Sequence, residues 1–283
     1  MLAIAGPTAS GKSALAVELA RRVGGEVLNA DALQVYDGLQ VLTARPTERE
    51  MGGVPHHLFG HVDPATRYSV GAWSRDAAEV IADILARGRR AVLVGGTGLY
   101  FKALFEGLAP VPEPGEAALS HAKALDPVAL RDAAERLDPV AVARTDGDPQ
   151  RLVRIVAVAV GTGKALSDWQ AETAPLVRDW RGWVLELERE RLYARIEARF
   201  DTMVRSGGLA EAESFASRGL ARDLPSMKAI GVAELLQVVR GEMELDVAVE
   251  LAKRNTRRLA KRQMTWFRNQ CADWERVEVA QGG

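Results

Sequence analysis

The sequence predicts an α/β fold in which a parallel β-sheet is flanked by helices. Three short apolar runs, at residues 2–5, 26–30 and 91–94, have the character of buried strands. Glycine-rich loops follow the first and the third, and Asp31 follows the second. Helical patterns at 12–22 and 74–86 alternate with these runs. Strands that alternate with helices form parallel sheets, and ligands bind beyond the carboxyl ends of such strands. We therefore expect the three loops to meet at one crevice.

A small helical insertion domain is expected to interrupt this core. Beyond the third strand the composition shifts to Pro, Ala, Asp and Glu with helical patterning, and a strand-like run returns only at 183–187. We assign residues 113–182 to the insertion, and residues 1–112 and 183–283 to the α/β core. Further helices should follow the last strand, and the longest spans about 246–269.

Composition narrows the class of protein. The 283 residues are 47% hydrophobic, which is sufficient for a large buried core. The 37 Lys and Arg residues nearly balance 38 Asp and Glu residues, so net charge neither favours nor excludes a nucleic-acid partner. The single cysteine, Cys271, excludes an intrachain disulfide, and the four histidines lack zinc-module spacing. With neither a signal-peptide pattern nor an apolar run of about 18 residues, we expect a soluble, cytoplasmic protein without membrane contact.

The strongest motif is a phosphate-binding loop between the first strand and the first helix. It matches G-x-x-x-x-G-K-[ST] in full, with the residues Gly6, Pro7, Thr8, Ala9, Ser10, Gly11, Lys12 and Ser13. Backbone N–H groups and the helix N-terminus favour a polyphosphate, Lys12 supplies a cation, and Ser13 can ligate Mg²⁺. The motif in this context predicts a diphosphate or triphosphate site on a P-loop NTPase-like core.

Two single residues follow strands that should face this phosphate site. Asp31 follows the second strand, where a carboxylate can accept a proton or hold a metal ion. Thr97 lies in the glycine turn after the third strand, and its hydroxyl is a comparable candidate. An aspartate at a strand end is more often a turn residue or helix cap. Both the chemical and the plain structural roles stay open for each residue.

A stripe of arginines follows the last strand. Arg191, Arg195 and Arg199 recur every four residues and share one helical face, from which they can clamp a diphosphate. The alternative is a solvated face whose charge is balanced by Glu188 and Glu197.

Two further segments have the character of RNA-binding surfaces. Asp148 and Pro149 begin a helix that projects Gln150, Arg151 and Arg154 from its first turns, although ordinary surface placement is equally compatible. The last long helix carries a run of cations without an acidic residue among them, which favours contact with RNA or diphosphate over a plain solvated helix. These cations are Lys253, Arg254, Arg257, Arg258, Lys261, Arg262 and Arg268.

The nearby aromatic and histidine residues carry less information. Trp266 and Phe267 can stack on bases, but aromatic residues near a helix end more often belong to the core. His56 and His57 are expected to be loop residues.

The order and spacing of the motifs resemble the bacterial tRNA dimethylallyltransferase family over nearly the whole chain. The phosphate loop alone is common to many nucleotide-binding proteins, whereas the complete combination is specific. The matching segments are residues 6–13, 29–36, 43–46, 55–58, 94–100, 148–151, 162–164, 195–203, 225–231 and 261–266.

This resemblance implies transfer of a dimethylallyl group from dimethylallyl diphosphate to the N6 amine of the adenosine 3′ of the tRNA anticodon, giving N6-isopentenyladenosine and diphosphate. It implies Asp31 as general base, with Thr97 and Arg199 at the diphosphate or the reacting amine. Mg²⁺ is the expected cofactor, with Ser13 as its ligand, and the expected state is a monomer. The implied contacts to the anticodon stem-loop are Asp31, Ala32, Leu33, Gln34, Thr97, Gln150, Arg151, Leu152, Val153, Arg154, Arg257, Lys261 and Arg262.

The sequence departs from the family pattern in two places, and other functions stay open. Ala32 stands where the family usually has serine, and Pro, Gly, Glu and Ala near residues 114–118 replace an arginine of the insertion. A small-molecule kinase with the same phosphate loop is one alternative. Such enzymes commonly have a metal-binding aspartate at the end of a core strand, whereas the third strand of this chain ends in Gly95-Gly96. A prenyltransferase that acts on free adenine nucleotides and a non-catalytic RNA-binding protein are the remaining alternatives.

Overall fold

The computed structural model describes residues 1–279, and the chain forms two compact units. One unit combines Met1–Phe101 with the chain from Val177 onward, and the other is Lys102–Leu176. The second unit begins and ends earlier than the expected insertion at 113–182, because its entering and leaving segments pair with each other. Leu176 N donates to Leu104 O over 2.9 Å, so both segments belong to the same unit.

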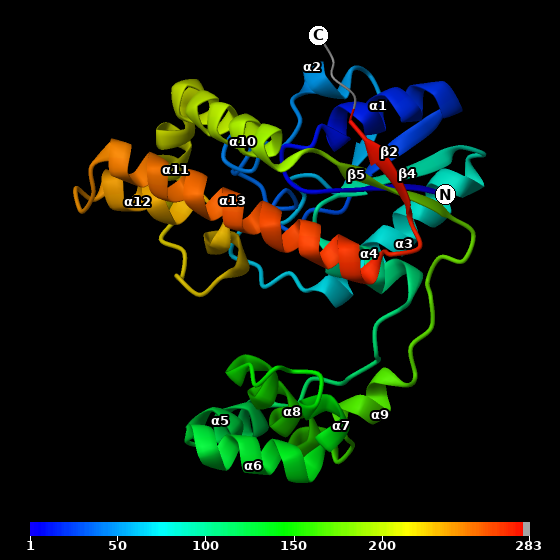
Figure 1. Ribbon diagram of the computed structural model, residues 1–283, viewed down its shortest axis with the longest axis vertical. Helices are drawn as coiled ribbons and strands as arrows, with labels where there is room; N and C mark the ends of the chain where they lie inside the picture. The colour runs from blue at the N-terminus through cyan, green and yellow to red at the C-terminus, as the bar shows by residue number, and fades with distance from the viewer. Residues whose placement is uncertain (280–283) are drawn as a thin grey trace. The chain divides into compact units, whose positions relative to one another are not determined.

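A six-stranded parallel sheet forms the centre of the first unit (Figure 1). The strand order is β3-β2-β4-β1-β5-β6, and every neighbouring pair is parallel. The sequence predicted four of these strands near their observed positions, but it gave no sign of β3 or β6. The strands are β1 (Leu2–Ala5), β2 (Gly25–Asn29), β3 (His56–His57), β4 (Arg90–Gly95), β5 (Arg181–Glu186) and β6 (Glu275–Glu278).

Helices cover this sheet and extend beyond it. Helix α1 packs on β4, and α10 and α13 pack against each other. Among residues 1–279 no helix combines the length and the apolar character that crossing a membrane requires. The helices of this unit are α1 (Lys12–Val23), α2 (Glu48–Met51), α3 (Val70–Ala86), α4 (Gly98–Phe105, which runs into the second unit), α10 (Arg189–Met203), α11 (Leu209–Ser217), α12 (Val232–Val239) and α13 (Leu245–Gln270), with a π-helical turn at Val204–Gly208 and a 3-10 turn at Pro225–Lys228.

The second unit is a small helical domain with its own core. Helix α8 begins after Asp148, whose side chain accepts a hydrogen bond from Arg151 N, as expected for an N-cap. Its apolar side packs on α5 and α6 and buries Leu152, Ile155 and Val156. The helices are α5 (Glu116–Ala124), α6 (Pro127–Leu137), α7 (Pro139–Val142), α8 (Pro149–Thr162) and α9 (Leu166–Gln170).

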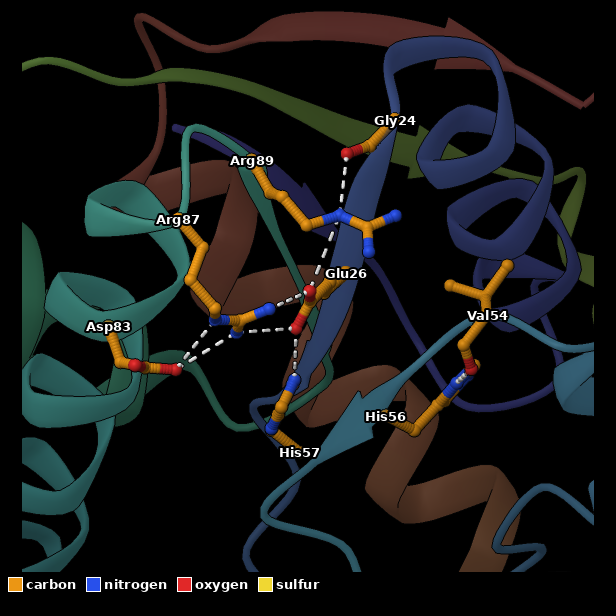
Figure 2. A network of polar contacts seen from close by, with 8 residues as sticks. All are labelled: Gly24, Glu26, Val54, His56, His57, Asp83, Arg87 and Arg89. Carbon is orange, nitrogen blue, oxygen red and sulfur yellow. Dashed lines mark hydrogen bonds and ion pairs between the residues drawn. The ribbon is translucent and has the colours of Figure 1, made fainter.

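A buried carboxylate ties the edge strand β3 to the rest of the sheet (Figure 2). Glu26 on β2 is only 1% exposed, and its oxygens lie 2.9 Å from Arg87 Nη2, 2.6 Å from His57 Nε2 and 3.4 Å from Arg89 Nε. Hydrogen bonding from Arg87 is the main cause that lowers the pKa of Glu26 to about 2.

The expectation that His56 and His57 are loop residues is wrong. Both pair in parallel with β2, opposite Val27 and Leu28. A two-residue strand is too short to show alternation, and His57 is held partly by Glu26, which lies far away in sequence.

We predict that Glu26→Gln lowers the free energy of unfolding by about 1–2 kcal/mol near neutral pH, because the buried carboxylate loses its charged hydrogen bonds to the half-exposed Arg87 and to His57. The folded-state pKa of Glu26 lies below its ordinary value of 4.5, so the stabilisation is present above about pH 4.5 and is lost as pH falls toward 2. Urea unfolding of the parent and the variant at several pH values measures this difference. Glu79→Gln, at an exposed position of α3, is the control, and a difference that does not change with pH would contradict the assignment.

Candidate active site

The phosphate loop forms a tight turn between β1 and α1. Ala9 and Gly11 both have left-handed backbones, with φ of 64° and 94°. Ser10 N donates to Pro7 O over 3.3 Å, and Lys12 Nζ donates to the same carbonyl over 3.2 Å. The loop therefore curls back on itself at the start of the helix.

Two desolvated cations and one carboxylate share this site. Desolvation lowers the pKa of Lys12 to about 8, while Asp31 acts to raise it and Arg199 to lower it further. Desolvation also lowers the pKa of Arg199, and Asp31 again opposes the shift. A cation that is poorly solvated gains most from a bound anion, so the electrostatics of this site favour an anionic ligand.

Helix α10 turns its arginine stripe toward the phosphate loop. Arg199 Nη2 donates to Thr8 Oγ1, and Arg195 Nη1 lies 3.5 Å from Ser10 O. Two of the three arginines therefore lie where the clamp interpretation requires them, beside the backbone that would hold a diphosphate.

The acids that would balance this stripe have other partners. Glu188 caps α10 by accepting from the N–H groups of its first turn, and Glu197 pairs with Arg257 over 2.6 Å. The third arginine, Arg191, donates to the carbonyl of Val279 over 3.4 Å. The arrangement thus differs from a solvated face neutralised by neighbouring glutamates.

Asp31 is held in a defined turn directly after β2. Asp31 N donates to Asn29 Oδ1 over 2.9 Å, and Asn29 Nδ2 donates back to Asp31 O and to Leu58 O, each over 3.0 Å. Asp31 Oδ1 accepts from Leu33 N over 3.0 Å. This turn uses one carboxylate oxygen, Oδ1, and the Asp31 side chain is half-buried.

Thr97 fastens the glycine turn to the Asp31 loop. Its Oγ1 accepts from Ala32 N over 2.9 Å, and its own N–H donates to Ala30 O over 3.1 Å. The loops approach so closely that a Cβ on Gly95 would lie 2.0 Å from Ala30 O. Glycine is therefore required there, and Thr97 lies next to the segment that carries Asp31.

Gln263 joins the same glycine turn to the phosphate loop, and single-residue reasoning from the sequence missed this role. Its Nε2 donates to Gly96 O over 2.9 Å, and its Oε1 accepts from Thr8 N over 2.9 Å. A Cβ on Gly96 would lie 2.3 Å from Nε2. The sequence signal for Gln263 is its place in the Lys-Arg-Gln segment at 261–263. The two neighbouring cations predict RNA contact and do not indicate a bond between loops.

The cations of α13 divide into two groups. Lys253 and Arg257 are neutralised within the unit, since Lys253 pairs with Asp201 over 2.7 Å and Arg257 with Glu197. The others are exposed: Arg254, Arg258, Lys261, Arg262 and Arg268. An open groove of about 520 Å³ follows this exposed side, and its lining is Arg258, Lys261, Arg262, Thr265, Trp266, Asn269 and Gln270.

The remaining predicted contacts differ in exposure. In the second unit Gln150, Arg151 and Arg154 are exposed, whereas Leu152 is buried in the helical core and Val153 packs partly against it. In the first unit Leu33 packs partly against a core cluster, and Gln34 donates its amide to the carbonyls of Thr43 and Ala44. The side chain of Leu152 thus belongs to the helical core, and its contact with RNA stays a prediction.

Comparison with known proteins identifies the family. The sequence model described as IPP transferase matches residues 34–270, and that described as isopentenyl transferase matches residues 1–58. A tRNA dimethylallyltransferase of Maricaulis maris is 56% identical, with 98% of this chain and 92% of that protein covered. One from a Caulobacter species is 52% identical with the same coverages.

Solved structures agree with the sequence relatives. The tRNA isopentenylpyrophosphate transferase of Bacillus halodurans is 37% identical with a TM-score of 0.72, and 98% of this chain and 89% of that chain are covered. A eukaryotic dimethylallyltransferase described as acting on tRNA is 27% identical with a TM-score of 0.87, covering 98% and 73% of the two chains. Because these relatives match nearly the whole chain, it belongs to the tRNA dimethylallyltransferase family.

Proposed function

We propose that this chain transfers the dimethylallyl group of dimethylallyl diphosphate to the N6 amine of the adenosine 3′ of the anticodon in tRNA. Family membership makes the chain a tRNA prenyltransferase. The observation that supports the detailed reaction is the grouping of the Asp31 carboxylate with the two desolvated cations Lys12 and Arg199. One end of this site suits a diphosphate, and the other suits an amine that loses a proton.

The reaction needs a leaving group that is stabilised as its charge grows. When the N6 nitrogen attacks the allylic carbon, the carbon–oxygen bond to diphosphate breaks and negative charge moves onto the diphosphate. Lys12, Arg199 and the backbone N–H groups of the loop are positioned before the reaction, so they stabilise this charge without reorganisation. Asp31 Oδ2 takes the proton that the amine loses as the new carbon–nitrogen bond forms.

Mg²⁺ fits the site only if the substrate supplies some of its ligands. Among residues 1–279 no cluster of three or more His, Cys, Asp or Glu side chains can hold a metal. Ser13 is exposed at the start of α1 and offers one hydroxyl, and Mg²⁺ commonly completes its shell with substrate phosphate oxygens and water. When bound there, the ion would neutralise charge on the leaving diphosphate.

We propose that the exposed cations of α13 and the first turns of α8 bind the phosphates of the anticodon stem-loop. Arg258, Lys261 and Arg262 line the groove beside Trp266, and bases can stack on such a ring. Arg257 contributes less to binding, because Glu197 already neutralises it. The groups proposed for chemistry lie in one compact unit of one chain, which supports a monomer as the functional state.

The base assignment predicts that Asp31→Asn lowers kcat by about 100-fold or more and leaves binding of the anticodon stem-loop nearly unchanged, because the amide cannot accept the proton. Transfer of labelled dimethylallyl groups to unmodified tRNA measures the rate. Asp37→Asn, at an exposed position of the same loop, is the matched control. Full activity in Asp31→Asn would remove Asp31 from the role of base. Phosphorylation of a small molecule by the parent, without prenyl transfer, would instead support a kinase.

The bridge between the loops predicts that Gln263→Glu lowers kcat by roughly 10-fold. The new carboxylate can still accept from Thr8 N, but it cannot donate to Gly96 O. Leaving this buried carbonyl without its hydrogen bond and opposite an anion destabilises the arrangement of the loops by about 1–3 kcal/mol. Single-turnover transfer measures the loss. The exposed neighbour Arg262 offers a contrast, because Arg262→Gln should weaken RNA binding and leave the single-turnover rate at saturating RNA unchanged. Equal effects of both substitutions on binding and rate would refute the bridging role.

A further inference from the structure

A glutamate on α11 holds a loop of the first unit through three consecutive backbone groups. Glu211 Oε1 accepts from Gln40 N over 2.7 Å and from Val41 N over 2.8 Å, and Oε2 accepts from Leu42 N over 2.7 Å. Charge-assisted bonds of this kind are stronger than those between neutral groups. Glu211 lies about 170 residues further along the chain than the loop, so no local pattern indicates the contact.

The loop held in this way fixes the side chain of Gln34. Gln34 Nε2 donates to Thr43 O over 2.9 Å and to Ala44 O over 3.0 Å. Both amide hydrogens are therefore used, and the reverse orientation would place Oε1 against two carbonyl oxygens. The amide is locked, and its oxygen is the group left to meet a ligand.

The loop conformation is costly to maintain without this support. Ala44 has a left-handed backbone with φ of 52°, which is unfavourable for a residue other than glycine. The same residue supplies one of the two carbonyls that hold Gln34. The apolar side chains of Leu39 and Leu42 anchor the loop in a buried cluster, but they do not determine where its carbonyls point.

We infer that Glu211 is a positioning residue for RNA recognition, because it holds the loop that makes Gln34 a pure hydrogen-bond acceptor. Gln34 lies three residues after Asp31, whose side chain accepts from Leu33 N in the same turn. An acceptor fixed there selects a base edge with an exocyclic amine, as on adenine or cytosine, and disfavours a keto oxygen. The inference rests on the proposed function, since the ligand is the RNA that the enzyme modifies.

The test compares Glu211→Gln, Gln34→Ala and the double variant with the parent. In Glu211→Gln one anionic acceptor becomes an amide whose N–H groups face backbone N–H groups, so the loop loses its hold. We expect the KM for an unmodified anticodon stem-loop to rise about 10-fold, with kcat and the KM for dimethylallyl diphosphate changing less than about 3-fold. Glu213→Gln, at an exposed position of the same helix, is the matched control.

The double variant separates positioning from general stability. If Glu211 acts through Gln34, the double variant should bind RNA no more weakly than Gln34→Ala alone. Three outcomes would overturn the inference. They are a double variant whose KM for RNA rises by the product of the two single effects, an unchanged KM for RNA in Glu211→Gln, and an equal rise in KM for RNA and for dimethylallyl diphosphate.

Two measurements do not depend on catalysis. Amide hydrogen exchange at residues 40–42 should accelerate in Glu211→Gln, and fluorescence anisotropy should show weaker binding of the stem-loop. A parent that transfers no prenyl group would refute the proposed function. A parent that is active, with unchanged exchange and binding in the variant, would refute only the inference about Glu211.

Discussion

The close approach of three loops at the carboxyl edge of the sheet is the constraint on which the site depends. The parallel strands β1, β2 and β4 deliver the phosphate loop, the Asp31 turn and the glycine turn to one edge. Thr97 and Gln263 then bond across these loops, and this is possible only because Gly95 and Gly96 carry no side chain. A change in one loop is thus transmitted to the others over a few bonds.

Support for this edge comes from polar groups that take no part in the chemistry. Glu26 fastens β3, and the carbonyl of Leu58 directly after β3 accepts from Asn29, which frames Asp31. Glu211 supports the neighbouring loop by accepting hydrogen bonds from its backbone N–H groups. Both carboxylates bind groups that are distant in sequence. Glu26 balances the positive charge of its arginine partners, and Glu211 accepts from backbone N–H groups that would otherwise lack these hydrogen bonds.

The sequence could predict what local spacing determines. Strand β1, the phosphate loop and α1 follow from a motif in its proper context, and the bounds of α13 follow from helical periodicity. It could not place β3, whose two residues are too short for a pattern. It also could not predict the hydrogen bond from Arg199 to Thr8, which depends on how α10 packs. Long-range contacts such as Gln263 with Gly96 leave no local signature, because they depend on tertiary packing.

The low basicity of Lys12 links ligand binding to proton uptake. With a pKa of about 8, this lysine is partly neutral in mildly alkaline solution, whereas a free lysine stays charged up to about 10.5. An anion bound beside Lys12 would restore the charge, since a neighbouring anion favours the protonated amine. Under the proposed function, an anionic substrate that binds above about pH 8 would draw a proton from the solvent, and its affinity would fall as the pH rises.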